Sequence, residues 1–276
     1  MRPRRALPLL AVVLAATLLI ACGKQPAPAP SGVSTATPTP TARATETPRL
    51  AATATATATV TATSQAEATL MKALLQRADV PGSNWTVQDI SARELAAATQ
   101  QAAGQASAPD LQGLVATCYP GQPTPGAANT PGVARAFVTA PPTLSMVIST
   151  VATTPNAAKA VEAMRTLKID AARTCLENAM KKGLGDQMPG ATVELVSVDS
   201  VSGLPANAAG FTLVLRITAS GITLTQHLAT LTAAQDQIFA STIALTMAEG
   251  ATTPALPVAA DRLGTLAAQR VSEARR

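Results

Sequence analysis

The sequence is poor in the residues on which most protein chemistry depends. Only 13% of its 276 residues are charged and 2% are aromatic, with a single histidine and three cysteines. One histidine and three widely spaced cysteines do not make an ordinary zinc site, so we expect no metal. The few aromatic residues are too scattered to form a stacking platform for single-stranded nucleic acid.

The first 21 residues read as a targeting segment. Arg2, Arg4 and Arg5 precede an uncharged, mostly aliphatic stretch over residues 6–21. A basic start, an apolar centre and a small residue before the cut are typical of a secretory signal. The stretch is shorter than the roughly 20 residues of a membrane-spanning helix. An uncleaved anchor and an ordinary secreted protein are the alternatives.

The end of this segment carries a more specific pattern, Leu19-Ile20-Ala21-Cys22. It resembles the lipobox of bacterial lipoproteins, in which the cysteine that matches Cys22 receives a diacylglycerol and becomes the mature N-terminus. The resemblance implies a protein held by lipid on the extracytoplasmic side of the cell membrane. Two or more acyl chains anchor firmly where one is marginal.

Residues 22–64 comprise Cys22 and a stalk dominated by Ala, Thr and Pro. The stalk has too little apolar surface to repay its ordering entropy, so we predict a disordered spacer. The formal charge of +5 belongs to the signal and stalk. When the charged residues of the signal and stalk are left out, fifteen basic and fifteen acidic residues remain. Those left out are Arg2, Arg4, Arg5, Lys24, Arg43, Arg49 and Glu46. A neutral remainder gives no support for a nucleic-acid partner.

Residues 65–276 are predicted to form a single α+β domain, with an antiparallel sheet of about six strands and helices packed on one face. Short turns such as Ser220-Gly221 join successive alternating segments, which indicates antiparallel pairing. The other face is predicted to be polar and solvent-facing, lined by Thr212, Arg216, Thr223, Thr225 and His227. Predicted strands cover residues 133–140, 144–152, 192–199, 210–219, 222–231 and 237–247, with an extended stretch at 85–90. Predicted helices cover residues 65–78, 92–103, 110–116, 156–182 and 256–272, and 120–132 is predicted to be a loop.

Two cysteines remain once Cys22 is assigned to the anchor. Cys118 and Cys175 are predicted to form a disulfide, because paired cysteines in an exported domain are normally bridged. The alternative is a redox site, but the sequence has no C-x-x-C spacing to favour it.

Few residues are candidates for chemistry. His227 is the only histidine, and neither G-x-S-x-G nor S-x-x-K occurs, so we predict no catalytic residues and no enzyme. No phosphate-binding glycine loop is present either, and we expect no cofactor. Trp85 is predicted either to plug the core or to form one wall of a ligand cleft. The candidates for such a cleft are Trp85, Arg216 and His227.

A second resemblance rests on short motifs of the domain. Leu74-Leu75, then Asp79-Val80-Pro81-Gly82 and Trp85, and a late Ala268-Gln269-Arg270, resemble the pattern of actinobacterial-type sensor-domain lipoproteins. The extracellular domain of a mycobacterial serine/threonine kinase is their best-known relative. The resemblance implies an antiparallel sheet with helices and a cleft, a role in ligand or envelope sensing, and no catalytic residues.

These observations together predict an anchored lipoprotein with an extracytoplasmic ligand-binding or sensor-like domain. The ligand would be a small molecule, a lipid or a wall fragment. One alternative is a structural or assembly lipoprotein that binds another envelope protein through the polar sheet face. An envelope hydrolase is a more distant alternative. The sequence names no particular ligand or partner.

Overall fold

The computed structural model of the chain describes residues 65–82, 84–97, 118, 131–139, 143–185 and 190–275. The signal segment, residues 1–21, and the stalk, residues 22–64, lie outside this range. So do the predicted helix at 110–116 and most of the predicted loop at 120–132. Among the described residues, no helix is long and apolar enough to cross a membrane.

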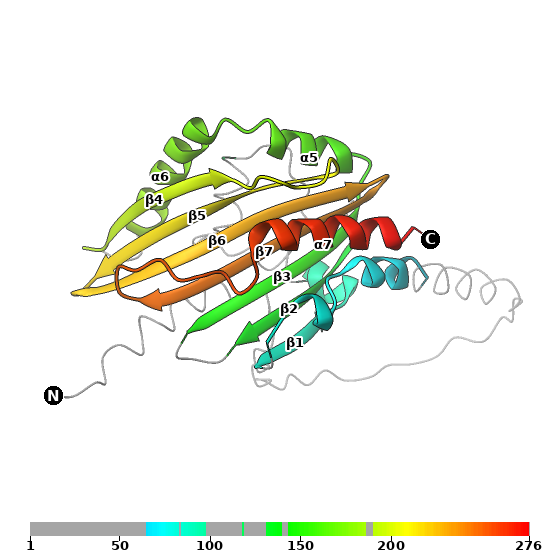
Figure 1. Ribbon diagram of the computed structural model, residues 1–276, viewed down its shortest axis with the longest axis horizontal. Coiled ribbons are helices and arrows are strands. Elements are labelled where there is room, and N and C mark those ends of the chain that lie inside the picture. The colour runs from blue at the N-terminus through cyan, green and yellow to red at the C-terminus, as the bar shows by residue number, and fades with distance from the viewer. Residues whose placement is uncertain are drawn as a thin grey trace, which may run out of the picture.

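The domain is built on one antiparallel sheet of seven strands in the order β1-β2-β3-β7-β6-β5-β4 (Figure 1). The predicted α+β class is confirmed, and the seventh strand is the extended stretch that begins at Trp85. The strands are β1 (Trp85–Ile90), β2 (Gly132–Thr139), β3 (Leu144–Thr153), β4 (Thr192–Ser200), β5 (Ala208–Ala219), β6 (Ile222–Gln235) and β7 (Ile238–Glu249).

Tight turns set the register of the three longest strands. Ser220 and Gly221 both have positive φ, at 53° and 79°, and they join β5 to β6. A two-residue turn of that conformation matches the twist of antiparallel strands, as the sequence predicted. Asp236, with φ 54°, lies in the turn between β6 and β7. Every neighbouring pair in the sheet is antiparallel.

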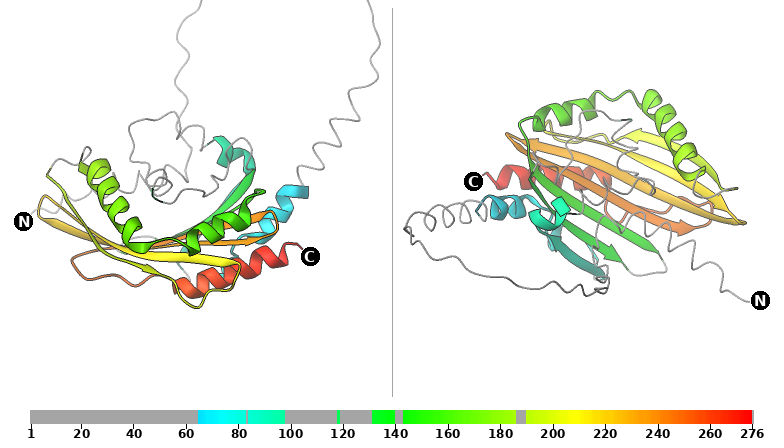
Figure 2. Two further views of the ribbon diagram at one scale, coloured as in Figure 1. Left: turned by 90° about the horizontal axis from the view of Figure 1, so that it is seen from above. Right: turned by 180° about the vertical axis from the view of Figure 1, so that it is seen from behind.

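Helices cover both faces of the sheet, and the prediction of helices on a single face was wrong. Helix α5 (Ala157–Arg165) and helix α6 (Ile169–Gly185) lie on what we term the α5–α6 face. Helix α7 (Ala260–Glu273) lies on the opposite, α7 face (Figure 2). The helical residues 65–73 share a core cluster with α7.

Helices cover both faces of the sheet because both faces of β5, β6 and β7 are apolar. On the α5–α6 face, Phe211 and Leu213 pack with Val161 of α5. On the α7 face, Ala229 and Leu231 pack with Leu263 of α7. On β6 the small alanines of this face alternate with threonines. The sequence of the strand therefore looks like that of a solvent-facing strand, although a helix covers it.

The predicted long helix at 156–182 is two helices. The break falls at residues 166–168, where the Thr166 hydroxyl and backbone N–H both donate to the carbonyl of Glu162. No proline or glycine marks this point, so the sequence carries no signal for it. Helix α5 packs across β5 and β6, whereas α6 follows the edge strand β4. The bend therefore lets one apolar stripe cover two parts of a twisted sheet.

Two other helices are shorter than predicted. The first ends at residue 73, and a 3-10 turn, η1 (Arg77–Asp79), follows it. The last begins at Ala260 instead of residue 256. Pro257 disfavours a helical conformation for the residue before it, and the residues from 250 to 259 instead run over the α7 face as a connection. Of the helix predicted at 92–103, residues 92–97 are helical and the rest lies outside the described part.

Candidate functional site

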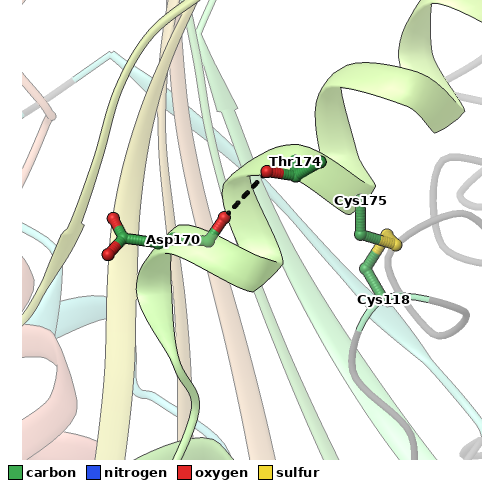
Figure 3. Close-up of a disulfide and its surroundings, with 4 residues drawn as sticks. All are labelled: Cys118, Asp170, Thr174 and Cys175. Atoms are coloured by element: carbon green, nitrogen blue, oxygen red, sulfur yellow. Dashed lines mark hydrogen bonds between the residues drawn. A yellow bond between two sulfur atoms is a disulfide. The ribbon is translucent and has the colours of Figure 1, made fainter.

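A disulfide joins Cys118 to Cys175, with the Cα atoms 5.6 Å apart (Figure 3). This separation is normal for a disulfide, and the predicted pairing is confirmed. Cys175 lies on α6, which packs against β4 at one edge of the sheet. Cys118 belongs to the connection between β1 and β2, which are the strands at the opposite edge, but it packs in the same core cluster as residues of α5 and α6. The bond thus ties two parts of the fold that are far apart in the sheet order, and it indicates an oxidising, extracytoplasmic environment.

Trp85 belongs to a packed corner at the β1 edge. Its Nε1 donates to the Pro81 carbonyl oxygen at 2.7 Å, and its ring meets the edge of Phe137 with centroids 6.5 Å apart. Gly82 has φ 101°, and a Cβ there would lie 3.3 Å from Nε1. The indole therefore packs over the turn at Gly82 and covers part of the core on the α7 face. This is the first of the two roles predicted for Trp85, a plug of the core.

An ion pair connects this corner to α7. The Arg270 Nε and Nη2 each donate to one carboxylate oxygen of Asp79 at 2.9 Å. The hydrogen bonding of the Arg270 guanidinium to the Asp79 carboxylate is the main cause that raises the pKa of Arg270 above its ordinary value. Asp79 also accepts from the Gln76 backbone N–H at 2.7 Å. Its side chain is only 8% exposed, against 25% for Arg270.

A second arginine holds the segment that follows the first helix. Arg135 on β2 donates to the Leu75 carbonyl at 3.1 Å and to the Gln76 side chain at 2.9 Å. It also pairs with the Asp89 carboxylate on β1. The Arg135 hydrogen bond holds the pKa of the Asp89 carboxyl below its ordinary value of 3.8. The short motifs that suggested a sensor-domain family thus lie together in one corner of the fold. The contacts that they make there are structural.

Arg216 and His227 lie together at a different corner of the α7 face. Arg216 pairs with Glu194 at 2.8 Å and donates to the Ala251 carbonyl at 3.2 Å. The His227 Nδ1 lies 3.0 Å from the Pro254 carbonyl oxygen, which places the ring proton on Nδ1. Thr225 donates to the Gly250 carbonyl at 2.6 Å. Through these hydrogen bonds, the three side chains attach the connection between β7 and α7 to the sheet.

The face predicted to be polar and open is therefore partly covered. Thr225 is fully buried, and Arg216 and His227 are only partly exposed beneath residues 250–254. The polar residues satisfy the backbone carbonyls of a segment without regular structure, which would otherwise lack partners. Sequence periodicity placed these residues on one face correctly but could not reveal what covers them.

The structure does not bring the three cleft candidates together. Trp85 is on the edge strand β1, whereas His227 is on β6, four strands away in the sheet order. At about 4.8 Å per strand, this separation is roughly 19 Å. Arg216 and His227 are on the neighbouring strands β5 and β6 and do share a corner.

A cavity of about 460 Å³ opens beside α5, at the end of the sheet where β6 turns into β7. Its floor includes the buried side chains of Val161 and Ala234. Its rim carries charges of both signs from Lys159, Glu162 and Asp236. Nothing in the sequence indicates this site, because alanine, valine and exposed helix charges carry no distinctive pattern.

No group of His, Cys, Asp and Glu residues that could hold a metal ion occurs in the described part of the chain. Comparison with protein-family models and with curated proteins finds no match.

Proposed function

We propose that this chain is a membrane-anchored lipoprotein whose extracytoplasmic domain binds a small ligand, as a sensor domain does. The observation that carries the proposal is Leu19-Ile20-Ala21-Cys22, placed after a basic and then an apolar segment. The disulfide supports it, because such a bond persists in the oxidising surroundings that an exported domain meets. The stalk at residues 22–64 would hold the domain away from the membrane.

Within the described part of the chain, the cavity beside α5 is our candidate for the ligand site. Its volume of about 460 Å³ lies within the usual range of small-molecule pockets. The apolar floor at Val161 and Ala234 suits a hydrocarbon part of a ligand. Lys159 on the rim has no hydrogen bond or ion pair within the described structure, so its ammonium is available for an acidic group. We therefore expect a small amphipathic molecule with an acidic group.

The anchor is tested by labelling with an alkyne fatty acid. In cells that produce the full chain, we expect label on the wild type and none on the Cys22→Ala variant, because Cys22 is the acylated thiol. A Cys118→Ala variant, which keeps Cys22, should keep the label. An unlabelled wild type, or label that persists in Cys22→Ala, would contradict a lipid anchor at Cys22.

The ligand site is tested by native mass spectrometry of the full chain in detergent, before and after organic extraction. We expect extra bound mass that extraction removes. Ala158 is exposed on α5 and lines the cavity, so Ala158→Trp should fill the cavity and abolish most of the bound mass. Ala171→Trp, at an exposed position of α6, is the matched control and should retain it. A wild type without bound mass would contradict the ligand-binding proposal and leave the anchor proposal standing.

A further inference from the structure

An ion pair neutralises one carboxylate at the rim of the cavity beside α5. Glu162 and Arg165, both on this rim, lie 2.9 Å apart. Arg165 also donates to the carbonyl oxygens of Ala206 and Ala208, which belong to the connection before β5 and to its first residue. The guanidinium is thus fixed between two walls of the cavity, and its charge cancels that of Glu162.

The second carboxylate of the rim, Asp236, is neutralised from outside the cavity. The Arg275 Nε lies 3.1 Å from the Asp236 Oδ2. Arg275 follows α7, which lies on the face of the sheet opposite to α5 (Figure 2). It therefore reaches the turn between β6 and β7 from the far side. Both side chains are more than half exposed, so the pair adds little stability, but it cancels the charge of Asp236 at the rim.

Lys159 is the one charged side chain of the described rim that has no partner. With Arg275 in place, the cations exceed the carboxylates around the cavity by this single ammonium. One uncompensated positive charge attracts a carboxylate and offers nothing to a neutral or positively charged group. The buried floor of Val161 and Ala234 takes the hydrocarbon part of the same molecule.

Asn207 supplies a second donor on the same rim. Its backbone carbonyl accepts from the Ala234 N–H at 2.9 Å, which fixes the residue beside the cavity floor. Its side-chain amide has no hydrogen bond within the described structure. An amide N–H can donate to a carboxylate, so Asn207 and Lys159 are complementary to the same group.

We propose that the cavity beside α5 selects a monocarboxylate with a hydrocarbon chain, and that Arg275 determines this selectivity by neutralising Asp236. The proposal rests on the proposed ligand site and specifies what that site takes. Without Arg275, the Asp236 carboxylate would repel a carboxylate bound at the rim. Arg275 does not line the cavity, so it is a positioning residue that acts through Asp236.

Binding of octanoate and of octan-1-ol to the full chain in detergent, followed by native mass spectrometry at low ionic strength, tests the proposal. The two probes have hydrocarbon chains of the same length and differ in charge. Arg275→Gln should weaken octanoate binding about threefold and leave octan-1-ol binding unchanged, because charges at an open rim interact weakly through water. Each probe partitions into the detergent equally for every variant, so the variants are directly comparable.

Removing the other partner should have the opposite effect. Asp236→Asn should strengthen octanoate binding, because it leaves Arg275 as an additional unpaired cation. Asparagine tolerates the positive φ of 54° at this position, so the turn is kept. The double variant with Arg275→Gln has the same net charge at the rim as the wild type, and it should bind octanoate as the wild type does.

Arg262→Gln is the matched control. Arg262 is exposed at the start of α7, 13 residues before Arg275, which is about 20 Å along a helix. Its loss should change the binding of neither probe. Equal effects of Arg275→Gln and Arg262→Gln on octanoate, or a parallel loss of octan-1-ol in Arg275→Gln, would overturn the role of Arg275. A wild type that binds neither probe up to about 1 mM would contradict the ligand site itself, and the selectivity with it.

Discussion

Removing the disulfide by the double change Cys118→Ala and Cys175→Ala should lower the free energy of unfolding by about 4 kcal/mol. The bond closes a loop with a sequence separation of 57 residues, and breaking it returns conformational freedom to the unfolded chain. It also frees the chain between β1 and β2 from α6, at the far edge of the sheet. Of the single contacts in this domain, it has the largest expected effect on stability.

Urea unfolding followed by Trp85 fluorescence measures this effect. Trp85 is the only tryptophan and packs against Phe137, so its emission reports on the folded corner directly. The wild type treated with reductant is the control, and its unfolding midpoint should fall to that of the double variant. Equal stability of the oxidised wild type and the double variant would show that the bond constrains little in the unfolded state.

Replacing Arg270 by methionine should cost about 3 kcal/mol. The change keeps most of the side-chain stem but removes both hydrogen bonds to Asp79, which leaves a nearly buried carboxylate without its cation. Breaking a buried ion pair from one side is costly because the remaining charge is uncompensated. The loss should release α7 from the corner formed by η1 and Trp85.

Arg275→Met is the matched control for this change. Arg275 lies just beyond the end of α7 and pairs with Asp236 at 3.1 Å, but both side chains are more than half exposed. Exposed pairs contribute little, so we expect almost no change in the unfolding midpoint. A double-mutant cycle with Asp79→Asn measures the coupling between Asp79 and Arg270. Similar midpoints for Arg270→Met and Arg275→Met would mean that the pair at Asp79 is no stronger than a surface contact.

Local patterns in the sequence predicted much of the sheet. Alternating apolar residues and the Ser220-Gly221 turn placed the hairpin of β5 and β6 correctly, although β6 runs four residues beyond its predicted end, because strand period and turn chemistry are local properties. The break in the long helix could not be predicted in this way. Residues 166–168 contain no proline or glycine, and the bend follows from the twist of the strands that the helices cover.

Local patterns also predicted one part of the candidate sites and missed the rest. The pattern put Arg216 and His227 on one face of adjacent strands, and they do share a corner. Their partners are carbonyls of residues 251 and 254, which lie beyond β7 and carry no sequence signal of that contact. The cavity beside α5 was missed for the same reason, since Val161 and Ala234 come from segments 73 residues apart that only folding brings together.

By itself the sequence determined what depends on composition and on near neighbours. These features are the basic and apolar start before Cys22, the neutral charge of residues 65–276, the α+β class and the predicted pairing of Cys118 with Cys175. Only the tertiary structure decided what the polar residues do. Asp79 and Arg270 are 191 positions apart, and nothing in either neighbourhood says that they meet. Local patterns specify strands and turns, whereas the partner of a charge depends on how distant segments pack.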